Sequence, residues 1–146
     1  MSANSRMTVA VHVLTWMALV HDRGRDVVTS DQIATSVATN PVVIRRGLAD
    51  LREAGLVTVR HGAGAGWTLA RAAESITLLD VFRAVHDDEP LFALHRGEPN
   101  QACPIGRGIR PALRGVYADA EEAVRRELAR VTIADVLRDT LATRSD

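Results

Sequence analysis

The chain has 146 residues, of which 47% are hydrophobic and only 3% aromatic, so it can form one small domain with a mainly aliphatic core. No stretch approaches the roughly 20 consecutive apolar residues of a membrane span, and no signal peptide is recognisable, so we expect a cytoplasmic protein with no membrane partner. The single cysteine, Cys103, excludes a disulfide within the chain, which is consistent with a reducing compartment.

The formal net charge is zero, but the two halves of the chain differ in sign. Residues 1–71 contain eight Arg against five acidic residues, a net charge of +3. Residues 72–146 contain ten Arg against thirteen acidic residues, a net charge of −3. A contact with nucleic acid is therefore expected in the N-terminal half.

Residues 7–20, MTVAVHVLTWMALV, are apolar on nearly every side of a helix, which predicts a helix buried on both faces. His12 lies within this segment. No second histidine or carboxylate stands at a metal-binding spacing, so we expect His12 to be a packed or hydrogen-bonded helix residue rather than a ligand.

Two short helices joined by a tight turn are predicted next. Thr29 and Gln32 form a capping box at the start of the first helix, whose apolar stripe is Ile33, Ala34 and Val37. This stripe predicts a helix packed on one side only.

The second helix of the pair is expected over residues 41–54. Asn40 is a favourable N-cap, Pro41 suits the first helical position, and Gly55 suits the left-handed residue that ends a helix. Its buried face is predicted to be Ile44, Leu48 and Leu51. The opposite face carries Val42, Arg46, Ala49 and Glu53, with Arg45 and Arg52 on its flank.

A β-hairpin with a glycine-rich tip is predicted over residues 57–70. Residues 56–60, LVTVR, have the alternating pattern and the β-branched side chains of a strand. Residues 67–69 are expected to form the second strand, after the loop 61–66. A tip of Gly and Ala can lie close to a phosphate backbone or enter a minor groove, with Arg60 and His61 supplying charge at its base. A phosphate-binding loop fits less well, because no Gly-Lys-Ser/Thr follows and no helix starts at the glycines.

The order of these elements predicts a winged helix-turn-helix DNA-binding domain over residues 1–86, in a chain that is mainly α with a small β-hairpin wing. An Arg pair on a helix is usually solvated surface, and alternating glycines fit many loops. Their occurrence together with the capped helices and the Asn-Pro turn favours DNA binding. The residues expected to contact DNA are Thr29, Ser30, Asn40, Pro41, Val42, Arg45, Arg46, Arg60, His61 and Gly62.

A helix over residues 77–85 is expected at the end of this domain, packed under it. An irregular connector, or sensor loop, is expected to follow over residues 87–104. Leu91, Phe92 and Leu94 of the connector are expected to be tucked down against the protein.

Residues 105–146 are expected to form dimerisation helices. Apolar residues recur there at steps of three and four in a long helix, in which Pro111 marks either the first turn or a bend. Its apolar stripe is too long for the winged domain to cover, so a partner subunit would cover it. The expected interface residues are Leu113, Val116, Ala120, Val124 and Leu128. Thr132 and Asp135 form a capping box that opens a final helix.

The sequence resembles the Rrf2 (Rrf-two) family of bacterial transcription regulators. The resemblance is carried by the N-terminal helix, the turn and helix beginning TNPVVIRR, the segment Leu-x-x-Ala-Gly-Leu-Val, the glycine wing and residues 76–81, ITLLDV. Residues 91–95 and 103–106 point to its YwnA-like branch. The family includes the iron–sulfur cluster regulator, the nitric-oxide-sensitive repressor and the cysteine-metabolism repressor.

The resemblance implies a homodimer with crossed long helices, in which the first helix packs against the partner. It also implies a palindromic operator recognised by the second helix of the motif. The family's wing usually enters the minor groove with Arg-Gly, whereas His61 precedes Gly62 here and Arg60 stands just ahead of it.

Cluster-binding members of the family carry three cysteines in the connector, where this chain has only Cys103. One thiolate per chain cannot supply the usual ligands of a [2Fe–2S] or [4Fe–4S] centre, so we expect no cofactor and no metal. Two interpretations of Cys103 stay open. It is either a small buried apolar residue or a redox sensor whose pKa is lowered by Arg107 and by the start of the long helix.

We therefore expect a dimeric DNA-binding transcription regulator, most simply a repressor, whose partners are double-stranded DNA, a second copy and an unknown small-molecule or redox effector. The alternative is a winged-helix protein-interaction module without a DNA target. An enzyme is not expected, because no Ser-His-Asp or paired-carboxylate site is recognisable, and Glu121-Glu122 fits a helix surface.

Overall fold

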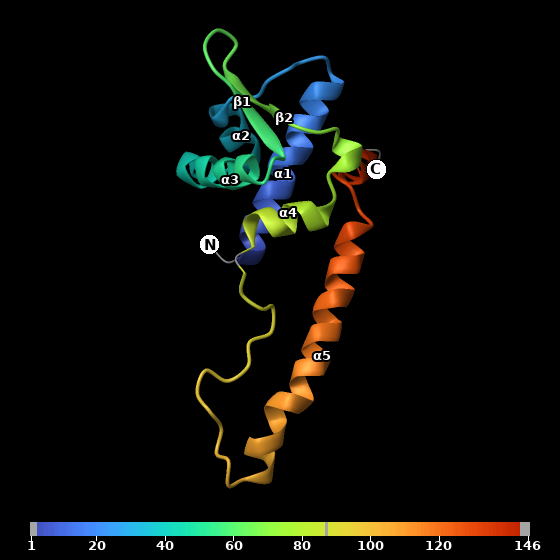
Figure 1. Ribbon diagram of the computed structural model, residues 1–146. Helices are drawn as coiled ribbons and strands as arrows, with labels where there is room; N and C mark the ends of the chain where they lie inside the picture. The colour runs from blue at the N-terminus through green and yellow to red at the C-terminus, as the bar shows by residue number, and fades with distance from the viewer. Residues whose placement is uncertain (1–2, 87, 144–146) are drawn as a thin grey trace.

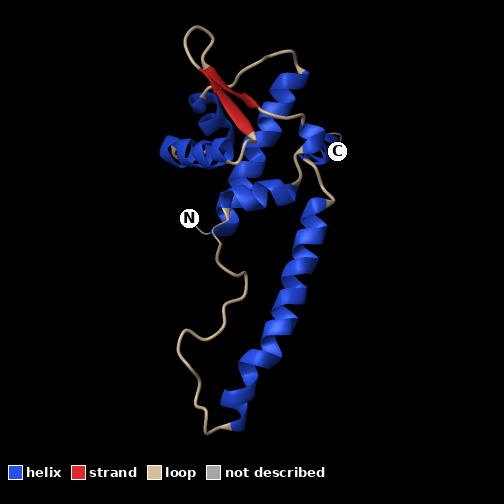
Figure 2. Cartoon of the chain, viewed as in Figure 1, coloured by secondary structure: helices blue, strands red, loops and turns tan. Residues whose placement is uncertain are grey.

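A computed structural model describes residues 3–86 and 88–143. The elements in chain order are α1 (Ala3–Asp22), α2 (Ser30–Val37), α3 (Pro41–Glu53), β1 (Val57–Arg60), β2 (Gly66–Leu69), the 3₁₀ helix η1 (Ala73–Ser75), α4 (Leu78–Val85), α5 (Pro104–Ala129) and α6 (Ile133–Ala142). In Figure 1, α1 to α4, the hairpin and α6 form one lobe, and α5 extends away from it as a single long helix. The fold is mainly α with one two-stranded hairpin in the described part, as predicted (Figure 2).

We call residues 3–86 together with 131–143 the winged-helix lobe. The outer ends of the expected domains, at residues 1–2 and 144–146, and residue 87 at the start of the expected connector lie outside the described residues. Within the described part, no helix combines the length and apolar character that crossing a bilayer requires.

Helix α1 is the centre of the lobe. It is contacted by α2, α3, α4, α6 and β2. The prediction that it is buried on both faces holds only in part, because Val9, Val11 and Trp16 are half-buried and His12 is exposed. Its most deeply buried side chains are Ala10, Val13, Leu14, Met17 and Ala18. His12 is exposed, and its Nε2 lies 3.0 Å from the Oγ of Ser36, so it is hydrogen-bonded to α2 as expected of a structural histidine.

The capping signals around α2 and α3 are confirmed. The Thr29 hydroxyl accepts from the Gln32 N–H at 3.2 Å, and the Gln32 Oε1 accepts from the Thr29 N–H at 3.0 Å. Asn40 caps α3 through its Oδ1, and Pro41 occupies the first helical position. After α3, Gly55 adopts a left-handed φ of 77°, which an L side chain rarely adopts.

The hairpin is held against the segment before α2. Strands β1 and β2 are antiparallel, with Val57 opposite Leu69 and Arg60 opposite Gly66. Trp67 forms a bridge with Val28, and its indole N–H donates to the Ser30 hydroxyl at 3.2 Å. The wing is therefore fixed in position relative to the start of α2.

Helix α6 returns to the lobe and packs on α1. Ile133 is fully buried, and Leu137 is 7% exposed. The Leu78 N–H donates to the Val131 carbonyl at 2.8 Å, and the Ile133 N–H donates to the Ile76 carbonyl at 2.9 Å. The boundary expected at residue 105 thus does not separate α6 from the winged-helix core, because the apolar face of α6 is covered by α1 rather than left for a partner.

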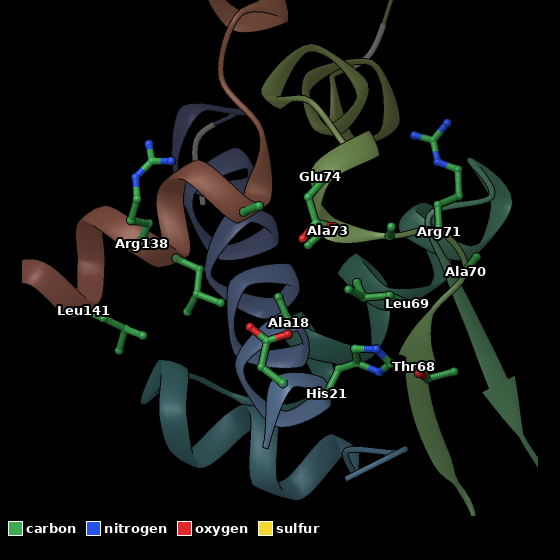
Figure 3. A pocket seen from close by; sticks show the side chains of 14 residues that line it. Ala18, His21, Thr68, Leu69, Ala70, Arg71, Ala73, Glu74, Arg138 and Leu141 are labelled. Atoms are coloured by element: carbon green, nitrogen blue, oxygen red, sulfur yellow. The ribbon is translucent and has the colours of Figure 1, made fainter. Parts of the chain in front are cut away.

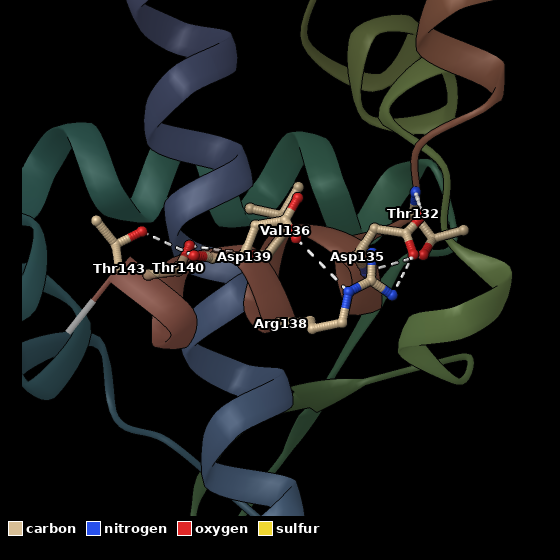
Figure 4. Close-up of polar contacts among 7 residues, drawn as sticks. All are labelled: Thr132, Asp135, Val136, Arg138, Asp139, Thr140 and Thr143. Carbon is tan, nitrogen blue, oxygen red and sulfur yellow. Dashed lines mark hydrogen bonds and ion pairs between the residues drawn. The ribbon is translucent and has the colours of Figure 1, made fainter. Parts of the chain in front are cut away.

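The start of α6 carries the predicted capping box. The Thr132 hydroxyl accepts from the Asp135 N–H, and the Asp135 carboxylate accepts from the Thr132 N–H at 2.9 Å. Arg138 then pairs with Asp135 at 3.1 Å and with Asp139 at 3.5 Å, all on the outer side of α6 (Figure 4). A similar box at Thr77 and Asp80 opens α4, and the two boxes meet through a bridge between Thr77 and Thr132.

Helix α5 contains no buried residue in its 26 positions. It begins at Pro104, seven residues before Pro111, so the expectation that Pro111 marks the first turn is wrong. The helix starts earlier because a proline suits the first position, where no N–H is needed.

The connector runs along one side of α5 and is attached to it at three points. The Leu91 N–H donates to the Glu121 carboxylate at 2.7 Å, and Arg110 donates to the carbonyls of His95 and Gly97. Phe92 stacks on Tyr117 with ring centroids 5.2 Å apart. Phe92 remains 44% exposed, so the expectation that it is tucked down is wrong, because the connector packs on a single helix that covers only one face of the ring.

Candidate nucleic-acid interface

One face of α3 packs on the core and the opposite face is free. Ile44, Leu48 and Leu51 have no exposed surface, whereas Val42 is 59% exposed. The remaining predicted outer-face and flank residues, Arg45, Arg46, Ala49, Arg52 and Glu53, are all exposed. The predicted division of α3 into a buried face and an exposed face is confirmed. The whole outer face is exposed, as a helix that enters the major groove of DNA requires.

The two arginines on this face are unpaired. Neither Arg45 nor Arg46 has an ion-pair partner among the described residues, unlike Arg60, Arg71, Arg125, Arg130 and Arg138. The charge and all five N–H donors of an unpaired guanidinium are available to bind a phosphate or the edge of a guanine base. The geometry therefore gives α3 the charge and donors that DNA contact requires.

The wing carries the other basic residues of the predicted site. Arg60 and His61 are exposed, and the Arg60 guanidinium lies 4.0 Å from the Asp26 carboxylate, an exposed pair that solvent screens. Gly62 has a φ of 81°, so the loop turns there in a conformation that suits glycine. In Figure 1 the loop projects from the end of the lobe opposite α5.

Thr29 and Ser30, at the start of α2, have structural partners. The Thr29 hydroxyl accepts within the capping box, and the Ser30 hydroxyl accepts from the Trp67 indole. Thr29 is exposed and Ser30 is half-buried. Sequence reasoning missed the bond between Ser30 and Trp67, because it joins two segments that lie 37 residues apart and have no shared local pattern.

Cys103, the candidate sensor, is the N-cap residue of α5 and is half-buried. Backbone N–H groups of Gly106 and then Ile105 lower the pKa of its thiol, against a smaller opposing effect of burial. The start of the helix therefore acts as predicted, whereas Arg107 is not among the causes of the lowered pKa. Cys103 is half-buried in the single chain, so both interpretations, a small apolar residue and a redox sensor, stay open.

An open cavity of about 670 Å³ lies behind the hairpin, between α1, β2, η1 and α6 (Figure 3). Two of its charged residues are already paired within the chain: Arg71 with Asp80 at 3.0 Å, and Arg138 with Asp135. Smaller cavities lie between the connector and the lobe end of α5, at about 470 Å³, and between Leu94 and Leu113, at about 300 Å³.

These observations define the class of protein: a winged helix-turn-helix whose second helix presents an open, basic face. Residues 3–139 match the sequence model of the Rrf2 family, which is described as an iron-dependent transcriptional regulator. The chain therefore belongs to the Rrf2 family of transcriptional regulators.

Individual relatives agree with this assignment. The chain is 39% identical over 134 residues to YwnA of Bacillus subtilis, which its name assigns provisionally to the HTH-type transcriptional regulators; the match covers 92% of this chain and 96% of YwnA. It is 30% identical over 97 residues to the HTH-type transcriptional regulator IscR of Cereibacter sphaeroides, covering 66% of this chain and 61% of that protein.

A solved structure also matches. A crystal structure provisionally described as a DNA-binding protein superposes with a TM-score of 0.70 at 34% identity, covering 90% of this chain and 98% of the other. The winged-helix arrangement found here is thus shared with a solved protein over nearly its whole length.

The family description raises the question of an iron site, and the residues present do not fit one. An iron–sulfur cluster needs several thiolates, and this chain has one cysteine. Among residues 3–86 and 88–143, no three His, Cys, Asp or Glu side chains come together in a way that could hold a metal ion. We derive no step of the function through iron.

Proposed function

We propose that the protein is a dimeric repressor that binds a palindromic operator. Each subunit places α3 in the major groove, with Arg45 and Arg46 on base edges or phosphates and with Thr29, Ser30, Asn40 and Pro41 near the backbone. The wing, through Arg60, His61 and Gly62, lies at the adjacent minor groove. The open outer face of α3 with its two unpaired arginines carries this proposal.

The dimer interface is proposed on α5. Ile105 is 70% exposed, Val116 is 60% exposed and Val124 is 36% exposed, which leaves a row of apolar side chains in water along one helix. Such a stripe is stabilised when a second copy covers it, and two copies provide the two recognition helices that a palindrome needs. The other proposed interface residues, Leu113, Ala120 and Leu128, are half-buried in the single chain.

We place this activity in the cytoplasm, where the chromosome of a bacterial cell lies, and we assign the chain no enzymatic reaction. An effector would act by changing the distance between the two α3 helices of the dimer. The cavities between the connector and α5 could hold a small molecule, and Cys103 at the start of α5 could be oxidised to a sulfenic acid or a disulfide.

The test is a titration of operator DNA, selected from genomic fragments, at two salt concentrations. Arg46→Ala should weaken binding by about 1–3 kcal/mol if the side chain contacts a base, and Arg45→Ala should behave similarly. Arg83→Ala, an exposed arginine on α4, is the matched control and should bind like the wild type. Unchanged affinity of both α3 variants, with folding intact, would overturn the assignment.

A role for Cys103 is tested separately. Binding is measured before and after treatment with peroxide or diamide, in the wild type and in Cys103→Ser. A loss of affinity confined to the wild type supports a redox sensor. If both proteins respond equally, or neither responds, Cys103 is structural and the effector is a small ligand.

The rival function is a winged-helix module that binds another protein. It predicts no DNA affinity that falls as salt rises, whereas phosphate contacts release counterions and make DNA binding strongly salt-dependent. The same titration therefore separates the two functions.

A further inference from the structure

The N-terminal tip of α3 is apolar and points outward. Val42, the second helical residue, is 59% exposed, and it stands directly opposite the buried side chains of Ile44 and Leu48. Val42 is not part of the hydrophobic core, whereas its neighbour Val43 is half-buried. Stability of the lobe therefore gives no reason for a β-branched apolar residue at this position.

The first three positions of α3, residues 41–43, have no free backbone N–H. Pro41 lacks an N–H, the Val42 N–H donates to the Asn40 Oδ1 at 2.9 Å, and the Val43 N–H donates to the Asn40 carbonyl at 3.0 Å. Helix N-termini that bind phosphate do so with unsatisfied N–H groups, and here the chain satisfies these groups itself. At positions 41 and 42 the helix offers a partner the ring of Pro41 and the two methyl groups of Val42, beside the side-chain amide of Asn40.

The major groove contains one kind of apolar group on its base edges, the C5-methyl group of thymine. The N-terminal residues of a recognition helix are those that contact base edges. We propose that Val42 contacts a thymine methyl group in each half-site, which makes it a specificity-determining residue. This inference rests on the proposed function, because it requires α3 to lie in the major groove.

Charge complementarity supports DNA as the occupant of this face. Arg46 follows Val42 by four residues on the same face, and Arg45 lies beside it; both are exposed and unpaired. An apolar tip followed one turn later by guanidinium groups fits a thymine adjacent to guanines or phosphates. A partner protein with an apolar pocket would match the valine but not the two positive charges.

The experiment replaces each thymine of the selected operator by uracil, one at a time, and measures the affinity of the full-length wild type. Uracil lacks only the methyl group, so base pairing is unchanged. One thymine per half-site should show a loss of affinity of roughly three- to tenfold, as expected for one lost apolar contact. Val42→Ala should bind the natural operator more weakly and should lose this sensitivity to uracil.

Two controls make the outcome decisive. The other thymines of the operator should tolerate uracil, and Ala49→Gly, on the same face of α3, should keep the wild-type sensitivity at the contacted thymine. Replacing that thymine by cytosine should weaken binding, and 5-methylcytosine should restore part of the loss.

If the wild type binds the operator but no thymine shows a sensitivity that depends on Val42, the inference is wrong and the proposed function stands. If the wild type binds no DNA, the proposed function itself fails.

Discussion

The winged-helix lobe contains every fully buried side chain of the described residues, and α5 contains none. The lobe closes its core with local helices and with α6, which returns from the far end of the chain to pack on α1. Helix α5 is equally regular, and among the described residues its principal neighbours are the connector and α4. The lobe is thus stabilised by its own chain, whereas α5 leaves apolar side chains exposed, and this difference supports the proposed dimer interface.

The largest effect is expected when a core residue supplied by α6 is truncated. Ile133→Ala should lower the free energy of unfolding by about 2–5 kcal/mol, because a fully buried side chain is replaced by a cavity. The measurement is urea unfolding at one fixed protomer concentration. Leu141→Ala, at an exposed position of the same helix, should cost far less. Equal stability of Ile133→Ala and wild type would show that α6 is not part of the core.

The second prediction concerns the apolar stripe of α5. Val116→Arg should weaken dimerisation by a factor of about one hundred or more, because an arginine would be buried without a partner. Sedimentation at micromolar concentration measures this. Ala118→Arg, exposed on the other side of α5, is the matched control and should remain dimeric. A wild type that is monomeric under the same conditions would contradict the proposed interface.

The third prediction concerns the junction where α6 joins α4. Burial raises the pKa of Asp80, but hydrogen bonds from Thr77 and the charge of Arg71 outweigh it, and the net pKa lies below its usual range. The stabilisation is therefore present above the pKa of an unfolded carboxyl group, about 4, and is lost as the pH falls through the lower folded value.

Asp80→Asn should accordingly destabilise the lobe at neutral pH by about 1 kcal/mol or less, since the carboxylate is partly screened by solvent. The deficit should vanish in acid, where the wild-type carboxyl group is also protonated. Urea unfolding from pH 7 down to pH 2 measures it. Asp139→Asn, on an exposed carboxylate, should match the wild type at every pH. A deficit of Asp80→Asn that is independent of pH would refute the electrostatic explanation.

The smallest expected effect is at the start of α5. The lowered pKa of Cys103 should make its rate of alkylation by iodoacetamide rise at a lower pH than in the urea-unfolded chain, where the helix N–H groups are absent. The unfolded protein serves as the internal control. Identical midpoints in the two states would show that the helix start does not activate the thiol.

Sequence reasoning placed most of the lobe correctly because its signals are local. Capping boxes, the Asn40-Pro41 turn and the glycine after α3 depend on residues within three or four positions of one another. The same logic could have found the box at Thr77 and Asp80, which has the same spacing as Thr132 and Asp135.

What could not be predicted depends on distant residues. Nothing local in residues 133–142 distinguishes a helix that packs on its own lobe from one that packs on a partner; the backbone bonds between residues 76–78 and 131–133 decide it. The exposure of Phe92 likewise follows from the single helix beneath it. At the site, the open faces were predictable from periodicity and the Asn40 cap of α3 from local sequence. The Ser30–Trp67 bond, in contrast, emerges only when the elements are placed in space.

The most direct test of operator recognition by a dimer is the sequence of the genomic DNA fragments that the purified full-length protein selects. If a self-sufficient lobe recognises DNA and α5 pairs two such lobes, the bound fragments should share an inverted repeat, with half-sites separated by about one helical turn of DNA or a multiple of it. Enrichment of a single unpaired half-site would contradict the dimer, and the absence of any enriched sequence would contradict specific DNA recognition by α3.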